Sequence, residues 1–442
     1  MVGVYGTVDA ARMCYLCLYA LQHRGQEGSG IAASDGKDIR LHKSAGQVAD
    51  IYQEKILHLL KGDIAIGTNK YSAEKELHNQ NLLPLTAELP FGQFAISLSG
   101  ALLSDKEREE LVKSGTIFTT SSDSEILLHL IARKCSYMQL EEAIADTLKY
   151  LKGAYSALFL TTDKLIAARD PNGFRPLILG KSGGAYILVS ESVALDLIGA
   201  EFIREIEPGE VVVIDKDGLR VGANIKKNAF CPCVFEYVYV ARPDSIIFGR
   251  SVYETRKECG RMLAAQLPVE ADIVVPVPDS GIAAAAGYAQ ASGLPFEYGI
   301  VRNHYVGRTF IRPTQAIRNF SVKVKLNPIK TIIKGKRLVV VDDSIVRGTT
   351  CRQIVQMLKE AGVREVHMRI ASPQVFFPCK YGIDVPSKDD LIANRFTLDE
   401  IRRFIGADTL GFISIENLIN AVGDSNHCFA CFSGDYPLKE EA

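Results

Sequence analysis

The sequence lacks three features that mark membrane, secreted and nucleic-acid-binding proteins. No apolar run approaches the roughly 20 residues that cross a bilayer. The chain does not begin with a basic region followed by an apolar stretch, so no signal peptide is visible. The formal net charge is −1, which provides no broad field to attract nucleic acid or an anionic membrane. We therefore expect a cytoplasmic protein without nucleic-acid or membrane partners, in which local groups hold any anionic ligand.

Internal repeats and low-complexity tracts are also absent, and 442 residues favour two domains. Up to about Asn228, strand segments with tight turns are mixed with a few amphipathic helices, which predicts a layered α+β domain. Beyond that point, near-continuous Val/Ile strands such as DIVVPVP (272–278) alternate with helices, which predicts a parallel sheet. The expected division is 1–228 and 229–442.

The segment RLVVVDDSIVRGTTCRQIV (337–355) carries the strongest chemical signal. A buried strand ends in Asp342 and Asp343, and a short loop with Gly348 and two threonines leads into a helix. This order places backbone N–H groups and a helix N-terminus against an anion at the carboxyl edge of the sheet.

Two adjacent carboxylates repel phosphate, so they are expected to hold sugar hydroxyls or a divalent cation that bridges to phosphate oxygens. Phosphate, ribose and metal in one loop point to a phosphorylated sugar. The alternative is an acidic turn that only caps a helix.

Several motifs resemble the amidophosphoribosyltransferase family, whose second domain is a type I phosphoribosyltransferase that binds phosphoribosyl pyrophosphate (PRPP). They run in matching order along nearly the whole chain: LQHRGQEGSGIA, SSDSEILLHLI, DPNGFRPL, ARPDSIIFGRSVYETRK, YVGRTFI, VVVDDSIVRGTT and GADTLGFIS. The resemblance implies an N-terminal Ntn-hydrolase-like αββα domain of the class II glutamine amidotransferase type. A type I phosphoribosyltransferase domain with a parallel sheet follows it. The family opens de novo purine synthesis by displacing pyrophosphate from PRPP with ammonia.

By resemblance, Asp342 and Asp343 contact the ribose hydroxyls and Mg2+, and Ser280 joins the Mg2+ shell. Arg308, in the closing loop YVGRTFI (305–311), and Lys325 are expected to meet the departing pyrophosphate. For these two cations the alternative is a solvated surface position. The full implied PRPP site is Asp279, Ser280, Arg308, Lys325, Asp342, Asp343, Ser344, Ile345, Val346, Arg347, Gly348, Thr349 and Thr350.

Four of the ten cysteines match positions that hold a 4Fe–4S cluster in one subset of the family: Cys233, Cys379, Cys428 and Cys431. In that subset the cluster is structural. The CxxC pair alone is weak evidence, and zinc in the same four-thiolate site is the alternative. We interpret Cys231 as a bystander, and Cys14 and Cys17 as core residues of a helix.

The glutaminase half departs from the family at its reacting groups. The nucleophilic cysteine is expected at the second residue, which is Val2. Lys70 replaces the arginine that binds the glutamine carboxylate, and Ser99, before Gly100, replaces the oxyanion-hole asparagine. Arg24 and Asp123 match. Covalent catalysis needs a nucleophilic atom, which valine lacks.

The predicted activity is therefore formation of 5-phosphoribosylamine from PRPP with free ammonia, or with ammonia from a partner protein, without glutaminase activity. One alternative is a non-catalytic PRPP- or nucleotide-binding paralogue that regulates or assembles with a complete amidotransferase. Another is use of a different amine on PRPP. The resemblance also implies homodimers or homotetramers and inhibition by purine nucleotides.

Overall fold

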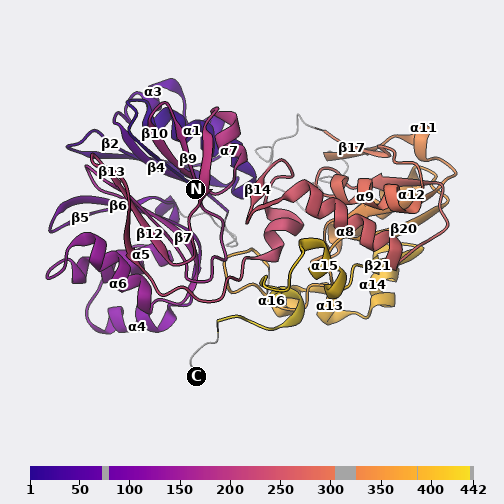
Figure 1. The fold of residues 1–442 in the computed structure, drawn as a ribbon. Helices are drawn as coiled ribbons and strands as arrows, with labels where there is room; N and C mark the ends of the chain where they lie inside the picture. The colour runs from indigo at the N-terminus through magenta and orange to yellow at the C-terminus, as the bar shows by residue number, and fades with distance from the viewer. Residues whose placement is uncertain (72–78, 304–324, 386, 439–442) are drawn as a thin grey trace.

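The computed structural model describes residues 1–71, 79–303, 325–385 and 387–438. Two parts lie side by side (Figure 1): indigo-to-magenta sheets at the N-terminal end, and an orange-to-yellow α/β unit at the C-terminal end. None of the helices in the described ranges is both long and apolar enough to span a bilayer.

The N-terminal part contains two antiparallel sheets stacked face to face. The seven-stranded sheet has the order β11-β9-β10-β1-β4-β2-β3, and the six-stranded sheet has the order β13-β12-β8-β7-β6-β5. In chain order the first comprises β1 (Val2–Tyr5), β2 (Gly28–Ser34), β3 (Ile39–Ala45), β4 (Ile64–Lys70), β9 (Ile178–Ser182), β10 (Ala185–Val189) and β11 (Glu201–Glu205). The second comprises β5 (Leu85–Leu89), β6 (Gly92–Leu102), β7 (Gly153–Leu160), β8 (Leu165–Arg169), β12 (Glu210–Asp215) and β13 (Gly218–Asn224).

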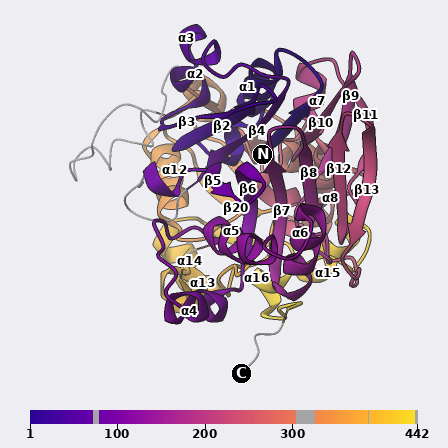
Figure 2. The ribbon, with the colours of Figure 1, turned by 90° about the vertical axis from the view of Figure 1, so that its left-hand side faces the viewer.

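Helices cover the outer face of each sheet, which Figure 2 shows from the side of this half. One layer contains α1 (Ala10–Ala20), α2 (Val48–Ile51), α3 (Glu54–Leu57) and α7 (Val193–Leu197), and the other contains α4 (Asp105–Lys113), α5 (Asp123–Lys134) and α6 (Leu140–Tyr150). Alternate side chains of β1 pack into different hydrophobic cores. Val2 and Val4 pack under α1, whereas Tyr5 packs between the two sheets. The expected αββα layering is confirmed.

The C-terminal part is built on a parallel sheet of order β16-β19-β20-β21, as expected. Its strands are β16 (Ile273–Pro276), β19 (Arg337–Asp342), β20 (Glu365–Ile370) and β21 (Thr409–Phe412). Val339 and Val341 face the layer of α8 (Val252–Gln266), α9 (Ile282–Ser292) and α15 (Ile415–Val422). Leu338 and Val340 face α12 (Thr349–Glu360) and α14 (Leu398–Ile405). Burial on both faces accounts for the continuous Val/Ile runs.

Shorter elements complete this part. They are β14 (Ile246–Ile247), β15 (Arg250–Ser251), β17 (Ile300–Arg302), β18 (Leu326–Pro328), α11 (Lys330–Ile333), α13 (Ile392–Arg395) and α16 (Ala430–Ser433). A π-helical turn, Glu236–Val240, begins at the junction between the two parts. The C-terminal segment returns to that junction, where Val234 N–H donates to the carbonyl of Cys428 at 3.3 Å.

Candidate active site

The acidic pair lies at the carboxyl end of β19, where the sequence placed it. Asp342 and Asp343 are each 7% exposed, and Asp343 N–H donates to Asp342 Oδ1 at 2.9 Å. Ser280 Oγ and Ser344 Oγ donate to the two oxygens of Asp343 at 3.4 and 3.3 Å. Burial raises the pKa of both carboxyls, and the charge of Asp343 raises the pKa of Asp342 further. Such a pair is stabilised when a cation or hydroxyl donors approach it.

The loop from Ser344 to Gly348 turns the chain into α12. Gly348 has φ 76°, a left-handed conformation that favours glycine, and a Cβ at that position would also force the Ile392 side chain to move. Ile345 is buried, and the carbonyl of Val346 accepts from Ile392 N–H at 2.9 Å, which anchors the loop. Thr349 and Thr350 are exposed at the first turn of α12. This helix start presents N–H groups and hydroxyls to an anion.

A buried cation not singled out from the sequence, Arg256 on α8, stands behind the acidic pair. Its side chain donates to the carbonyls of Tyr237 at 2.6 Å and Ala241 at 2.8 Å. Burial lowers the pKa of Arg256. The negative charge of Asp343 raises this pKa and is the largest of the effects that oppose burial. Arg256, Asp343 and Ser280 line one small internal cavity.

The acidic pair fits Mg2+ in the way phosphoryl-transfer sites use it. Within the described ranges, no group of three or more His, Cys, Asp or Glu side chains is arranged around a single metal ion. Mg2+ is commonly held by one or two carboxylates, with water and substrate phosphates completing its shell. Two buried carboxylates beside a phosphate loop meet that requirement.

The remaining implied PRPP contacts are more dispersed. Asp279 is half-exposed and paired with Arg302 at 2.5 Å, and Arg347 is exposed, 3.8 Å from Asp390. Lys325 is exposed beside β18. Arg308 and the loop 305–311 lie outside the described residues. The structure therefore places the acidic pair, Ser280 and the 344–350 loop together, while Asp279 and Arg347 carry other ion pairs.

The nucleophile position of the glutaminase half is closed. Val2 is 0% exposed, and Met1 is 4% exposed with its ammonium group donating to Ser190 Oγ at 3.2 Å. Burial and the charge of Arg24 lower the pKa of this amine to about 5. Cys14 and Cys17 are buried in α1, as expected.

Asp123, Ser99 and Gly100, which the motifs assign to the glutamine pocket, lie on α5 and β6. Asp123 accepts from Leu102 N–H at 2.8 Å, and burial raises its pKa although the charge of Lys70 opposes this. Gly382, from the C-terminal part, packs so closely that a Cβ on it would lie 2.5 Å from the carbonyl carbon of Gly100. A backbone segment thus lies directly against the expected oxyanion position.

Arg24 occupies a buried ion cluster at the junction of the two parts. Its guanidinium contacts Glu191 at 2.6 Å and Glu236 at 2.7 Å, and both carboxylates are 0% exposed. Glu191 also pairs with His23 at 2.6 Å and accepts from Ser245 Oγ at 2.7 Å. Arg24 therefore joins the two parts, a role that its sequence motif does not reveal.

This buried ion cluster predicts that the folded protein loses stability at acidic pH. Burial alone raises the pKa of Glu191, but Arg24 and His23 outweigh it and hold the pKa below its usual range. A depressed folded-state pKa contributes stability that is complete above pH 4.5 and lost as pH falls further. Thermal unfolding of the wild type and of Glu191→Gln from pH 6 to 3 tests this. The stability difference between them should shrink below pH 4.5, by up to about 1.4 kcal/mol per pH unit. A constant difference contradicts the assignment.

The four expected ligand thiols gather at the same junction. Cys233, Cys428 and Cys431 are buried, and the electrostatic neighbours of Cys431 are Cys233, Cys379 and Cys428. Cys233 and Cys428 pair in a parallel β-bridge, and the thiols of Cys428 and Cys231 share a hydrogen bond. A 4Fe–4S cluster spreads its thiolates over separate irons, whereas zinc gathers them around one ion. Among the residues that the structure describes, no group of three or more His, Cys, Asp or Glu side chains is arranged around a single metal ion.

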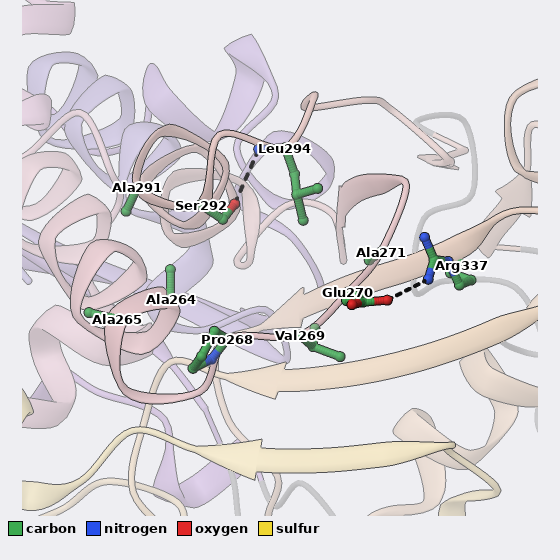
Figure 3. A pocket seen from close by; sticks show the side chains of 10 residues that line it. All are labelled: Ala264, Ala265, Pro268, Val269, Glu270, Ala271, Ala291, Ser292, Leu294 and Arg337. Carbon is green, nitrogen blue, oxygen red and sulfur yellow. Dashed lines mark hydrogen bonds and ion pairs between the residues drawn. The ribbon is translucent and has the colours of Figure 1, made fainter.

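A surface groove of about 420 Å³ lies away from these groups (Figure 3). Ala264, Ala291, Leu294 and Arg337 are among its lining residues. Arg337 begins β19, whereas Asp342 ends it, so the groove opens at the opposite edge of the sheet from the acidic pair. It is not part of the candidate active site.

Comparisons with known proteins agree with this geometry. Residues 73–197 match a glutamine amidotransferase domain, and residues 259–371 match a phosphoribosyl transferase domain. Amidophosphoribosyltransferase 2, chloroplastic, of Arabidopsis thaliana is 49% identical over 99% of this chain and 79% of its own length. The Bacillus subtilis amidophosphoribosyltransferase is 46% identical over 99% of this chain and 93% of its own length. The chain belongs to the amidophosphoribosyltransferase family.

The structural comparison extends this result to the whole fold. A solved B. subtilis glutamine PRPP amidotransferase, complexed with ADP and GMP, superimposes with a TM-score of 0.93 at 45% identity. The match covers 99% of this chain and 96% of that chain. The amidophosphoribosyltransferase family and fold inferred from the motifs are therefore confirmed.

Sequence reasoning missed the buried charges of this family member: Glu191, Glu236 and Arg256, and the role of Arg175. A signal was present for Glu236, since it is the single carboxylate in the otherwise apolar and aromatic run VFEYVYV (234–240). A lone charge in such a run is costly to bury unless it is paired, so it predicts a buried partner.

Proposed function

We propose that this chain forms 5-phosphoribosylamine from PRPP with ammonia as the nitrogen donor and Mg2+ as the cofactor. One observation supports this most strongly: a buried acidic pair at the end of β19 leads directly into an anchored phosphate loop and α12. Relatives that match 99% of this chain are named amidophosphoribosyltransferase, which supports the same class of reaction. This reaction opens de novo purine synthesis.

The residues of the proposed site bind different parts of PRPP. The N–H groups and hydroxyls of residues 344–350 hold the 5′-phosphate, while Asp342 and Asp343 orient the ribose hydroxyls. The two carboxylates would also hold Mg2+, which would supply positive charge for the departing pyrophosphate. Ser280 lies against Asp343 and completes the side of the site that faces pyrophosphate. Positioning and charge stabilisation supply most of the acceleration in such a reaction.

We further propose that glutamine hydrolysis is absent. Relatives of this chain include a glutamine PRPP amidotransferase, but Val2 offers no nucleophilic atom and is fully buried. Ser99 supplies one hydroxyl in place of an amide donor, and losing a single oxyanion donor costs roughly 10²–10³ in rate. Lys70 keeps a positive charge but loses the bidentate geometry of arginine.

A pyrophosphate-release assay tests the proposal. Anaerobically prepared full-length protein receives PRPP and Mg2+, with either ammonium or glutamine. Turnover with ammonium and none with glutamine supports it. Tight nucleotide binding with no turnover on either donor overturns it and favours a regulatory paralogue of a complete amidotransferase. Glutamate release from glutamine overturns the nitrogen-donor proposal alone.

Restoring one residue should not restore glutamine use. In Val2→Cys, the new thiol lies beneath α1 beside Val189 and Gly67, and the Ser99 and Lys70 positions remain altered. We expect glutamate release from glutamine to stay at background while ammonium turnover is retained. Glutaminase activity in Val2→Cys would show that the rest of the pocket is intact.

The finer assignments belong to the same proposal. Cys233, Cys379, Cys428 and Cys431 are proposed to bind a structural 4Fe–4S cluster, supported by their mutual proximity and burial. We propose domains 1–228 and 229–442, a homodimer or homotetramer, a cytoplasmic location and inhibition by purine nucleotides. The B. subtilis structure, which is complexed with ADP and GMP, supports the last of these. The ammonia is supplied either free or by a partner protein.

A further inference from the structure

Arg175, from the N-terminal part, reaches the ring of thiols. It belongs to DPNGFRPL, the turn that joins β8 to β9. Asp170 organises this turn by accepting from Asn172 N–H at 2.9 Å and Phe174 N–H at 3.0 Å. Arg169 Nε donates to the carbonyl of Arg175 at 2.8 Å. The backbone of Arg175 is therefore held in place from both sides.

The Arg175 guanidinium is buried, at 4% exposure, and uses its two terminal nitrogens. One donates to Glu236 Oε1 at 2.8 Å, and the other donates to the carbonyl of Tyr381 at 3.0 Å. The third nitrogen, Nε, is buried and its N–H has no hydrogen-bond partner among the residues that the structure describes. An unpaired donor on a buried charged group is costly, so its position calls for an acceptor.

The surroundings of Arg175 are the proposed ligands. Cys233 N–H donates to the carbonyl of Phe174, the preceding residue, at 3.1 Å. Tyr381, whose carbonyl Arg175 binds, follows Cys379 by two residues and donates its own N–H to Cys379 Sγ at 3.3 Å. Burial raises the pKa of Cys233 and of Cys379. For both thiols the positive charge of Arg175 lowers the pKa and is the largest effect that opposes burial. The guanidinium is thus close to two of the four thiols, and its hydrogen bond to the carbonyl of Tyr381 fixes it beside the Cys379 loop.

We propose that Arg175 Nε–H donates a hydrogen bond to a thiolate or sulfide sulfur of the 4Fe–4S cluster, so that a residue of the glutaminase-like half stabilises the cofactor. This inference rests on the proposed cluster. Its second consequence is mechanical: one side chain connects the cluster, the 379–383 loop and Glu236 at the junction. Arg175 is a positioning residue for the cofactor and has no contact with the reacting atoms.

The test compares Arg175→Lys with Arg24→Lys in the full-length chain. Both arginines are buried and both pair with Glu236, but Arg24 also pairs with Glu191, whereas Arg175 binds the carbonyl of Tyr381 beside Cys379. Each protein is reconstituted anaerobically with iron and sulfide. Iron content, cluster absorbance during exposure to a chelator, and the reduction potential from EPR-monitored titration are then measured.

We expect all three proteins to load four irons. In Arg175→Lys the cluster should be lost about 10–100-fold faster, the usual range for removing a partner of a metal ligand. Its reduction potential should become more negative, because hydrogen bonds to sulfur favour the reduced, more negatively charged cluster. Arg24→Lys should match the wild type in both properties.

The outcomes separate the two proposals. Failure of the wild type to bind iron and sulfide overturns the cluster itself. A loaded Arg175→Lys protein with wild-type loss rate and potential overturns the role of Arg175 and leaves the cluster standing. Equal effects in both variants assign the change to the Glu236 junction and also overturn it.

A measurement on the wild type covers the case in which Arg175→Lys does not fold. With ¹⁵N-labelled arginine, pulsed EPR of the reduced cluster should detect a coupled arginine nitrogen. Absence of that coupling overturns the inference.

Discussion

Asp343→Asn should lower kcat/KM for ammonium-dependent pyrophosphate release by roughly 10²–10³, the range seen when one preorganised charge-stabilising group is removed. Ser280 and Ser344 donate hydrogen bonds to the Asp343 carboxylate, and the charge of Arg256 stabilises it. The substitution removes the negative charge that these three side chains stabilise. Asparagine preserves the shape but binds Mg2+ more weakly than a carboxylate does. The measurement is initial rate against PRPP concentration at several Mg2+ concentrations.

Asp272→Asn provides the matched control. Asp272 precedes β16 and pairs with Arg337 at 3.1 Å, at the opposite edge of the same sheet. Its loss should leave turnover unchanged. If Asp343→Asn retains wild-type kcat/KM at all Mg2+ concentrations, the acidic pair is not the ribose and metal site, and the alternative of an acidic helix-capping turn gains support.

Glu236→Gln should destabilise the protein by about 3–5 kcal/mol, the usual cost of removing one member of a buried ion pair. The carboxylate is 0% exposed and accepts from Arg24 at 2.7 Å and Arg175 at 2.8 Å. Glutamine retains the volume but removes the carboxylate that pairs with the buried Arg175 guanidinium and leaves Arg24 paired with Glu191. For domains of this size the thermal midpoint should fall by roughly 10 °C.

Glu54→Gln is the control for this prediction. Glu54 forms a two-bond pair with Arg12 at 2.7 Å, but both side chains are exposed to solvent. Exposed pairs contribute little, so this variant should unfold near the wild-type temperature. Scanning calorimetry on both variants makes the comparison. Equal small shifts in the two would show that the Glu236 cluster does not stabilise the junction.

The strand–loop–helix structure of the proposed phosphate site could be predicted because it is local in sequence. The strand, acidic pair, loop and helix start occupy one continuous segment, 337–355, and each step follows from the residue types in it. Gly348 illustrates this: a glycine before two threonines at a helix start has few structural interpretations, and the structure shows it at φ 76°. The alternation of Val/Ile strands with helices likewise predicted the parallel sheet.

The glutaminase half shows where local reasoning ended. The motif around Arg24 matches the glutamine pocket of the family, whereas in the structure its guanidinium binds Glu191 and Glu236. Those partners lie 167 and 212 positions along the chain. No pattern within a helix or strand specifies a partner at such a separation, since it depends on how the two parts dock.

By itself, the sequence determined the order of strands and helices, the strand–loop–helix segment 337–355, a valine at position 2, and four cysteines at the positions expected for ligands. These depend on residue chemistry and short-range spacing. The tertiary structure alone decided that Gly382 packs against Gly100 and that Glu236 joins Arg24 and Arg175. It also decided that Arg175 Nε–H, near Cys233 and Cys379, has no partner within the described part of the chain. The physical reason is that burying charge requires compensation from whatever side chain docking brings near, and docking joins residues that the chain keeps far apart.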